Sequence, residues 1–123
     1  FIYPRTGAAF GPLTNQMLTN IHVTKVFMGC AGISEDGLYN ANALMVEAQH
    51  RMIQAADQVI VVADHTKFGK RALAQMMQLE DIDHLVTDDG IDESWRRRLA
   101  EHNVNLIVAP LEDSMRRVKE VSA

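Results

Sequence analysis

The feature that most constrains the fold is a continuous run of largely β-branched residues, QVIVVAD, from Gln58 to Asp64. A strand with one face in water alternates apolar and polar residues, whereas an unbroken apolar run is typical of a strand covered on both faces. Such strands occur mainly in parallel sheets, whose crossover connections bring helices onto the sheet. The run therefore favours an α/β fold with this strand inside the sheet.

The rest of the chain alternates between strand-like and helix-like segments. Further strands are predicted at Thr24–Cys30, Asp83–Asp89 and Val104–Pro110, and helices at Gly11–Ile21, Ala43–Ala56 and Ile91–Asn103. Asn42 is predicted to cap the second helix, and Leu73–Leu79 is left open between a short helix and an edge strand. Strands separated by helices of this length predict a single α/β domain over residues 1–123, with a mostly parallel sheet flanked by helices on both faces.

Composition excludes several classes of protein. Twelve basic against sixteen acidic residues give a net charge of −4, which argues against a predominantly electrostatic nucleic-acid binder. No apolar run approaches the ~20 residues that cross a bilayer, and no signal peptide is visible, so we expect no membrane partner. The single cysteine, Cys30, excludes an internal disulfide and fits a reducing cytoplasm. Because the chain starts with Phe1, we expect a fragment of a longer protein.

Polar residues follow the predicted strands in three places: Ser34–Asp36, Asp64–Lys67 and Thr87–Asp89. In parallel sheets, ligands bind outside the carboxyl ends of the strands. Convergence of the three segments at that edge therefore predicts a ligand site.

The segment GCAGISEDGLYN, residues 29–40, supports two interpretations. Gly32 and Gly37 allow sharp turns and close approach to a ligand, and the Asp36 carboxylate suits sugar hydroxyls or proton transfer. The alternative is a glycine-rich connection from strand to helix with an ordinary Asp-Gly turn. Spacing alone leaves both open.

In ADHTKFGK, residues 63–70, the Lys67 ammonium suits a phosphate or carboxylate, and Thr66 offers a hydroxyl. The alternative is a surface turn in which Lys67 only pairs with Asp64. His65 is expected to be a hydrogen-bonding loop residue, and no metal site or cofactor is predicted, since zinc needs three or four ligands in recognisable spacing.

Two further features are expected to be structural. The arginines of WRRRL point to different sides of their helix, which favours a solvated face over a nucleic-acid stripe. Cys30 has no neighbour that would clearly lower its pKa, so it is expected to act as a small buried hydrophobe.

Taken in order, KVFMGCAGISEDGLYN, HRMIQAADQVIVVADHTKFGK and LEDIDHLVTDD resemble the effector domain of DeoR-family transcriptional regulators, from about Gly11 to Ala109. The resemblance implies an N-terminal winged helix-turn-helix followed by a sugar-phosphate-sensing domain. That domain is similar in fold to ribose-5-phosphate isomerase, glucosamine-6-phosphate deaminase and the CoA transferases. It also implies operator DNA as a partner, through the missing N-terminal domain, and a homo-oligomer.

Two departures from the family pattern limit what this chain should do alone. No helix-turn-helix precedes Phe1, so specific operator binding is not expected of it. The upstream phosphate loop of the sensor domain is absent too, which predicts only part of the ligand cradle and an exposed sheet edge.

The enzyme relatives bear on catalysis. Where the deaminases carry Asp-Gly-His, this sequence has Asp36, Gly37 and Leu38, and leucine cannot move a proton. Lys67 resembles the lysine that holds the substrate phosphate in those enzymes. The resemblance thus implies a non-enzymatic sensor with no catalytic residues, and its predicted ligand contacts are Lys67, Asp36, Asn40, Asp64, Thr66, Gly32 and Gly37.

The alternatives are an active sugar-phosphate isomerase or deaminase that uses Asp36 and His65, and a phosphoacceptor domain. The second of these lacks its acid pair at the first strand, since KVFMGC ends without one.

Overall fold

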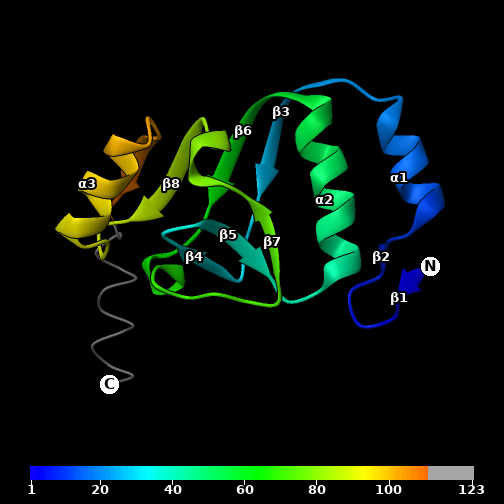
Figure 1. The fold of residues 1–123 in the computed structure, drawn as a ribbon, viewed down its shortest axis with the longest axis horizontal. Helices are drawn as coiled ribbons and strands as arrows, with labels where there is room; N and C mark the ends of the chain where they lie inside the picture. The colour runs from blue at the N-terminus through cyan, green and yellow to red at the C-terminus, as the bar shows by residue number, and fades with distance from the viewer. Residues whose placement is uncertain (111–123) are drawn as a thin grey trace.

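The structure, a computed structural model, describes residues 1–110. Figure 1 shows its helices and strands along the chain. They are β1 (Ile2–Tyr3), β2 (Ala8–Ala9), α1 (Pro12–Thr19), β3 (Val23–Met28), β4 (Gly32–Ser34), β5 (Gly37–Asn40), α2 (Ala43–Ala55), β6 (Ala56–Val62), β7 (Ala74–Met77), β8 (His84–Asp88), α3 (Glu93–Glu101) and β9 (Asn105–Ala109). Two single-turn 3₁₀ helices, η1 (His65–Lys67) and η2 (Leu79–Asp81), follow β6 and β7.

A four-stranded parallel sheet in the order β3-β6-β8-β9 confirms the predicted α/β fold. The β-branched run forms most of β6, which pairs with β3 on one side and β8 on the other. The register places Met28, Val61, Leu85 and Leu106 side by side across the sheet. The other predicted strands and helices are also found, with ends that differ by a residue or two.

Helices and loops lie on one face of this sheet. The strand order advances in a single direction, and right-handed crossovers then place every connection on the same side. The side chains on that face form the core together with residues of α2, α3 and the strands β4, β5 and β7. Core members from the sheet include Val26, Met28, Val59, Val61 and Leu85.

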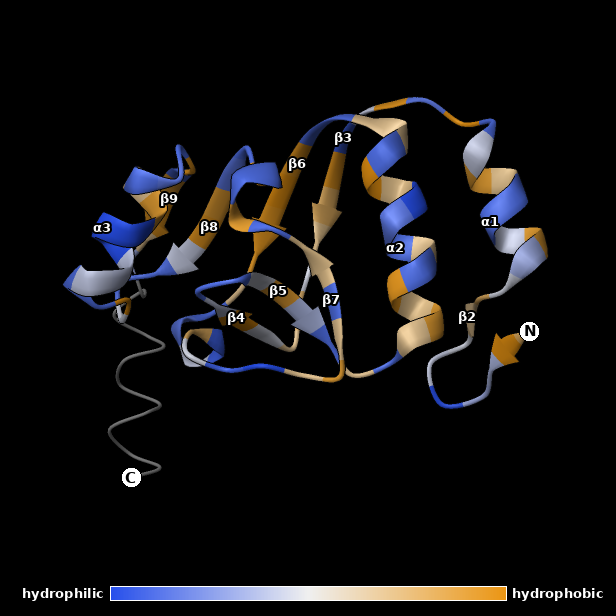
Figure 2. Cartoon of the chain, viewed as in Figure 1, coloured by the Kyte–Doolittle hydropathy of each residue, from blue (hydrophilic) through white to orange (hydrophobic). Residues whose placement is uncertain are grey.

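The opposite face corrects the expectation of helices on both sides. Alternate strand residues point there, and Phe27 is 66% exposed, Val62 51% and Ile107 46%. Figure 2 shows the apolar colouring that runs along β3, β6 and β8. Ile60, which the register pairs with Phe27, is 8% exposed on this face, but among residues 1–110 the helices cover only the other face of β6.

A second sheet, in the order β4-β5-β7, was not predicted. β4 and β5 form a tight antiparallel hairpin in which Ser34 pairs with Gly37, so residues 35 and 36 make the turn. The segment is thus a hairpin, and not the strand-to-helix connection that one of the two interpretations gave. The ambiguous Leu73–Leu79 segment supplies β7, which pairs with β5.

Helices α1 and α2 begin where the sequence predicts a helix start. The Asn42 side chain accepts hydrogen bonds from the backbone N–H groups of Leu44 and Met45, which confirms the predicted cap of α2. α1 begins at Pro12 and packs against α2 and not against the sheet (Figure 1). Within the described part of the chain, every helix is too short or too polar to span a membrane.

Candidate functional site

The parallel strands bring three chain segments together at their carboxyl ends. Cys30 lies just after β3, Asp64 just after β6, and Asp88 ends β8. Asp64 caps η1, because its carboxylate accepts hydrogen bonds from the backbone N–H of Thr66, at 2.8 Å, and from the Thr66 hydroxyl. These bonds, with the charge of Lys67 beyond them, hold the pKa of Asp64 below its usual value. A fixed anionic turn therefore precedes Lys67.

Lys67 is half-buried at this edge. Its ammonium makes no ion pair within 4.0 Å of any carboxylate in residues 1–110, so the alternative in which it only pairs with Asp64 does not describe the structure. Its charge acts on the Cys30 thiol and the Asp64 carboxylate. The cation is thus held near the strand ends with its three donors available to an anion.

His65 and Asp88 form a clamp between the loops after β6 and β8. His65 Nδ1 lies 2.6 Å from Asp88 Oδ2, and the His65 backbone N–H donates to Oδ1 at 2.6 Å. Burial opposes ionisation of Asp88, but these bonds and one from the Gly90 N–H outweigh it and lower the pKa. His65 is therefore the hydrogen-bonding loop residue expected, with a partner that the sequence did not identify.

Gly90 makes room for this clamp. A β-carbon at position 90 would lie 2.5 Å from His65 Nδ1, which is closer than real contacts allow. The Asp-Gly pair after the strand was the available sequence signal, because glycine permits close approach.

Asp36 lies in the β4–β5 turn and pairs with an arginine that the sequence analysis had not singled out. Arg71 Nη2 lies 2.7 Å from Asp36 Oδ2, and the Tyr39 hydroxyl donates to the same oxygen at 3.2 Å. No hydrogen bond or ion pair among residues 1–110 joins Asp36 to Lys67. The loop between them is nevertheless attached to the hairpin strand, since the Gly69 N–H donates to the carbonyl of Ile33.

The remaining predicted ligand contacts, Asn40, Gly32 and Gly37, make packing contacts inside the protein. Asn40 is buried, and its amide nitrogen donates to Gln49 Oε1 at 3.0 Å and contacts Met76 Sδ. A β-carbon at Gly32 would lie 2.4 Å from the Lys70 carbonyl oxygen, and one at Gly37 would lie 2.1 Å from that of Met77. These residues hold the hairpin against its neighbours, and their part in ligand binding stays a prediction.

Two other predicted features can be placed. Burial raises the pKa of Cys30 to about 11 against the opposing charge of Lys67, so the thiol is neutral and not a nucleophile at neutral pH. In WRRRL, Arg98 lies over the Trp95 ring, with its guanidinium carbon 4.9 Å from the ring centroid, and pairs with Glu35. No group of three or more metal-ligating side chains occurs in the described residues.

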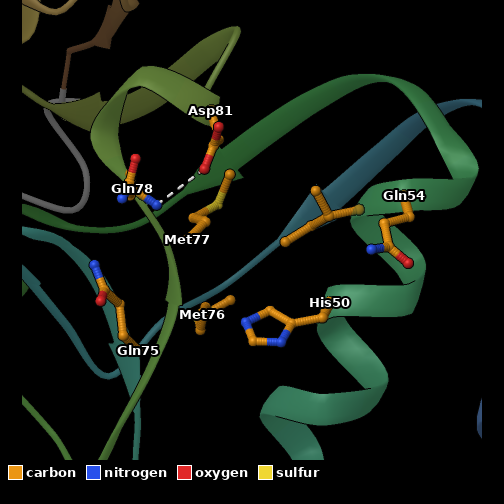
Figure 3. A pocket seen from close by; sticks show the side chains of 8 residues that line it. His50, Gln54, Gln75, Met76, Met77, Gln78 and Asp81 are labelled. Atoms are coloured by element: carbon orange, nitrogen blue, oxygen red, sulfur yellow. Dashed lines mark hydrogen bonds between the residues drawn. The ribbon is translucent and has the colours of Figure 1, made fainter.

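Two concave regions flank this arrangement. A cleft of about 570 Å³ lies beside the hairpin turn and is lined by Ser34, Glu35, Gly69, Arg71, Trp95 and Arg98. A groove of about 370 Å³ lies between α2 and β7, where His50 and Met76 face each other (Figure 3). None of the predicted ligand contacts is among the lining residues of either region.

The two residues that the isomerase or deaminase alternative requires have separate partners. His65 pairs with Asp88 and Asp36 pairs with Arg71, and no hydrogen bond or ion pair among residues 1–110 joins Asp36 to His65. Within residues 1–110, the carboxyl ends of the strands carry a cation without a paired carboxylate, together with polar turns and glycines that let backbone groups approach closely.

The DeoR C terminal sensor domain family model matches residues 1–89. The chain is 33% identical over 102 residues to an uncharacterized HTH-type transcriptional regulator, YulB, and 35% identical over 99 residues to the HTH-type transcriptional repressor GlcR, both of Bacillus subtilis. It is 24% identical over 102 residues to the L-fucose operon activator of Haemophilus influenzae.

These alignments cover 80% to 82% of the chain but 38% to 41% of the relatives. The chain therefore spans about two fifths of the length of these regulators. Their names are those of transcriptional regulators.

Proposed function

The chain belongs to the DeoR C-terminal sensor domain family, and on that premise we propose that it binds a phosphorylated sugar and so controls DNA binding by a separate helix-turn-helix domain. The observation that carries the proposal is Lys67, a half-buried cation at the carboxyl edge of the sheet with no ion pair among the described residues. A phosphate dianion would gain from its charge and its three donors.

The turn residues would complete the contact with the effector. Thr66 and Asp64 fix the turn that presents Lys67, and the second Asp36 oxygen can accept from a sugar hydroxyl beside Arg71. His65, held by Asp88, keeps the two loops at a constant separation. The hairpin would be held in place by Asn40, Gly32 and Gly37, which would support the site without contacting the effector.

Ligand binding changes regulation only if the two states of the regulator bind the ligand with different affinities. We propose that the cytoplasmic protein is a homo-oligomer whose DNA-competent and DNA-incompetent arrangements differ at this edge. The names of the relatives, which include a repressor and an activator, fit either direction of response.

The test is calorimetric titration of the full-length protein with a panel of hexose and pentose phosphates. Lys67→Ala should weaken binding of the preferred sugar phosphate by about 10- to 100-fold, because a charged hydrogen bond contributes roughly 1.5–3 kcal/mol. Lys25→Ala is the matched control, since this exposed lysine lies in β3 away from the strand ends. Equal affinities for the wild type and Lys67→Ala would reject the proposed role of Lys67.

A further inference from the structure

Two arginines from different elements converge on the turn of the β4–β5 hairpin. Arg71, from the loop before β7, pairs with Asp36 at 2.7 Å. Arg98, from α3, pairs with Glu35, with 3.2 Å between Nη1 and Oε1. Two adjacent carboxylates on one short turn thus occupy two guanidinium groups.

These ion pairs are easily exchanged. The side chains of Glu35 and Asp36 are 72% and 50% exposed, and exposed pairs contribute little to stability. Each pair joins one guanidinium nitrogen to one carboxylate oxygen, although a guanidinium carries five donors in a fork that fits a phosphate or carboxylate. A ligand anion can therefore replace either carboxylate with better geometry.

The space beside the turn fits a small molecule. The cleft of about 570 Å³ that Arg71 and Arg98 line lies within the range of small-molecule sites. Within it, Arg98 lies over the Trp95 ring, which packs against Phe68 with the two ring centroids 5.1 Å apart. Arg98 is thus positioned without depending on Glu35.

We propose that this cleft is a second anion subsite, in which a phosphate or carboxylate group of the effector replaces Glu35 at Arg98 and Asp36 at Arg71, while the Asp36 carboxylate stays in the turn and accepts from a sugar hydroxyl. This inference rests on the proposed sensor function and narrows the ligand to a sugar with two acidic groups. Gly69 lines the cleft and is two residues from Lys67, a separation of at most ~7 Å along the chain. The cleft therefore lies next to the turn that carries Lys67, so one sugar would place one acidic group at each.

The first test detects the subsite with inorganic phosphate alone. In the full-length protein, labelled at its arginine side chains, the Nε–Hε signals of Arg71 and Arg98 should shift together on titration with phosphate. The double variant Glu35→Gln/Asp36→Asn should bind phosphate at least 5-fold more tightly, because the competing carboxylates are gone. Arg98→Gln should abolish the shift of Arg71, whereas Arg97→Gln, on the exposed side of α3, should not. Absence of the shift, or no gain in the double variant, would overturn the subsite.

The second test compares glucose 6-phosphate with glucose 1,6-bisphosphate. We expect the wild type to prefer the bisphosphate at least 10-fold and Arg98→Gln to lose that preference, while Lys67→Ala weakens binding of both. Binding of both sugars with equal affinity would overturn the subsite and leave the sensor proposal standing. Conversely, a phosphate shift at both arginines without binding of either sugar would retain an anion site and reject the sensor proposal.

Discussion

At the scale of single residues, the site depends on contacts that its sequence motif only partly shows. Lys67, Asp64 and Thr66 could be selected because they follow an apolar strand directly. Asp88 could not be paired with His65, since 23 residues separate them and only the pairing of β6 with β8 brings them together. Gly90 is part of the same contact because the His65 ring occupies the space that a side chain at position 90 would need.

Gly90→Ala should disrupt this clamp. The added methyl group would meet the His65 ring, so the free energy of unfolding should fall by about 1–3 kcal/mol, as expected for overpacking. Gly29→Ala is the matched control, because a β-carbon there has nothing within 4 Å and it should change stability by less than about 1 kcal/mol. Urea unfolding measures both, and equal effects would argue against the clamp.

At the scale of elements, long periodic segments were predictable and short ones were not. α2 was found with its cap because its apolar spacing extends over 13 residues. β4 and β5 have three and four residues, too few to show a period, and their glycines resemble a loop. The hairpin was therefore missed, although its Asp-Gly dipeptide is a turn signal.

The cap of α2 gives a direct prediction at this scale. Asn42→Ala should lower the free energy of unfolding by about 1 kcal/mol, because two N–H groups of the first turn lose their acceptor. Asn42→Ser should recover most of the loss. Thermal denaturation followed by circular dichroism checks this, with Asn20→Ala, at the exposed end of α1, as a control expected to stay within about 0.5 kcal/mol. A larger loss in Asn20→Ala than in Asn42→Ala would contradict the assignment of the cap.

At the scale of the molecule, the parallel sheet follows from the alternation of strands and helices, but its strand order and the cover of its two faces were not predicted. The β6 run indicates cover on both sides, and sequence periodicity cannot tell which connection lies on which face. The handedness of the crossovers settles that question by placing them together.

Substitutions on the two faces of the sheet should therefore lower the free energy of unfolding by different amounts. Leu85→Ala, in the fully buried face, should destabilise the chain by about 2–5 kcal/mol. Phe27→Thr, on the open face, should change stability by less than about 0.5 kcal/mol, since Phe27 is 66% exposed. Chemical denaturation of both variants of this chain measures the difference, and comparable losses would contradict the described arrangement.

The central claim is that an effector binds at the carboxyl edge of the parallel sheet. Hydrogen–deuterium exchange of the full-length protein, with and without its preferred sugar phosphate, tests it most directly. We predict slower exchange in peptides that span residues 63–71 and 87–91. Residues 103–106, which lead into β9 at the amino ends of the parallel strands, should show no change. Protection confined to residues 103–106, or to the α2–β7 groove, would contradict the claim.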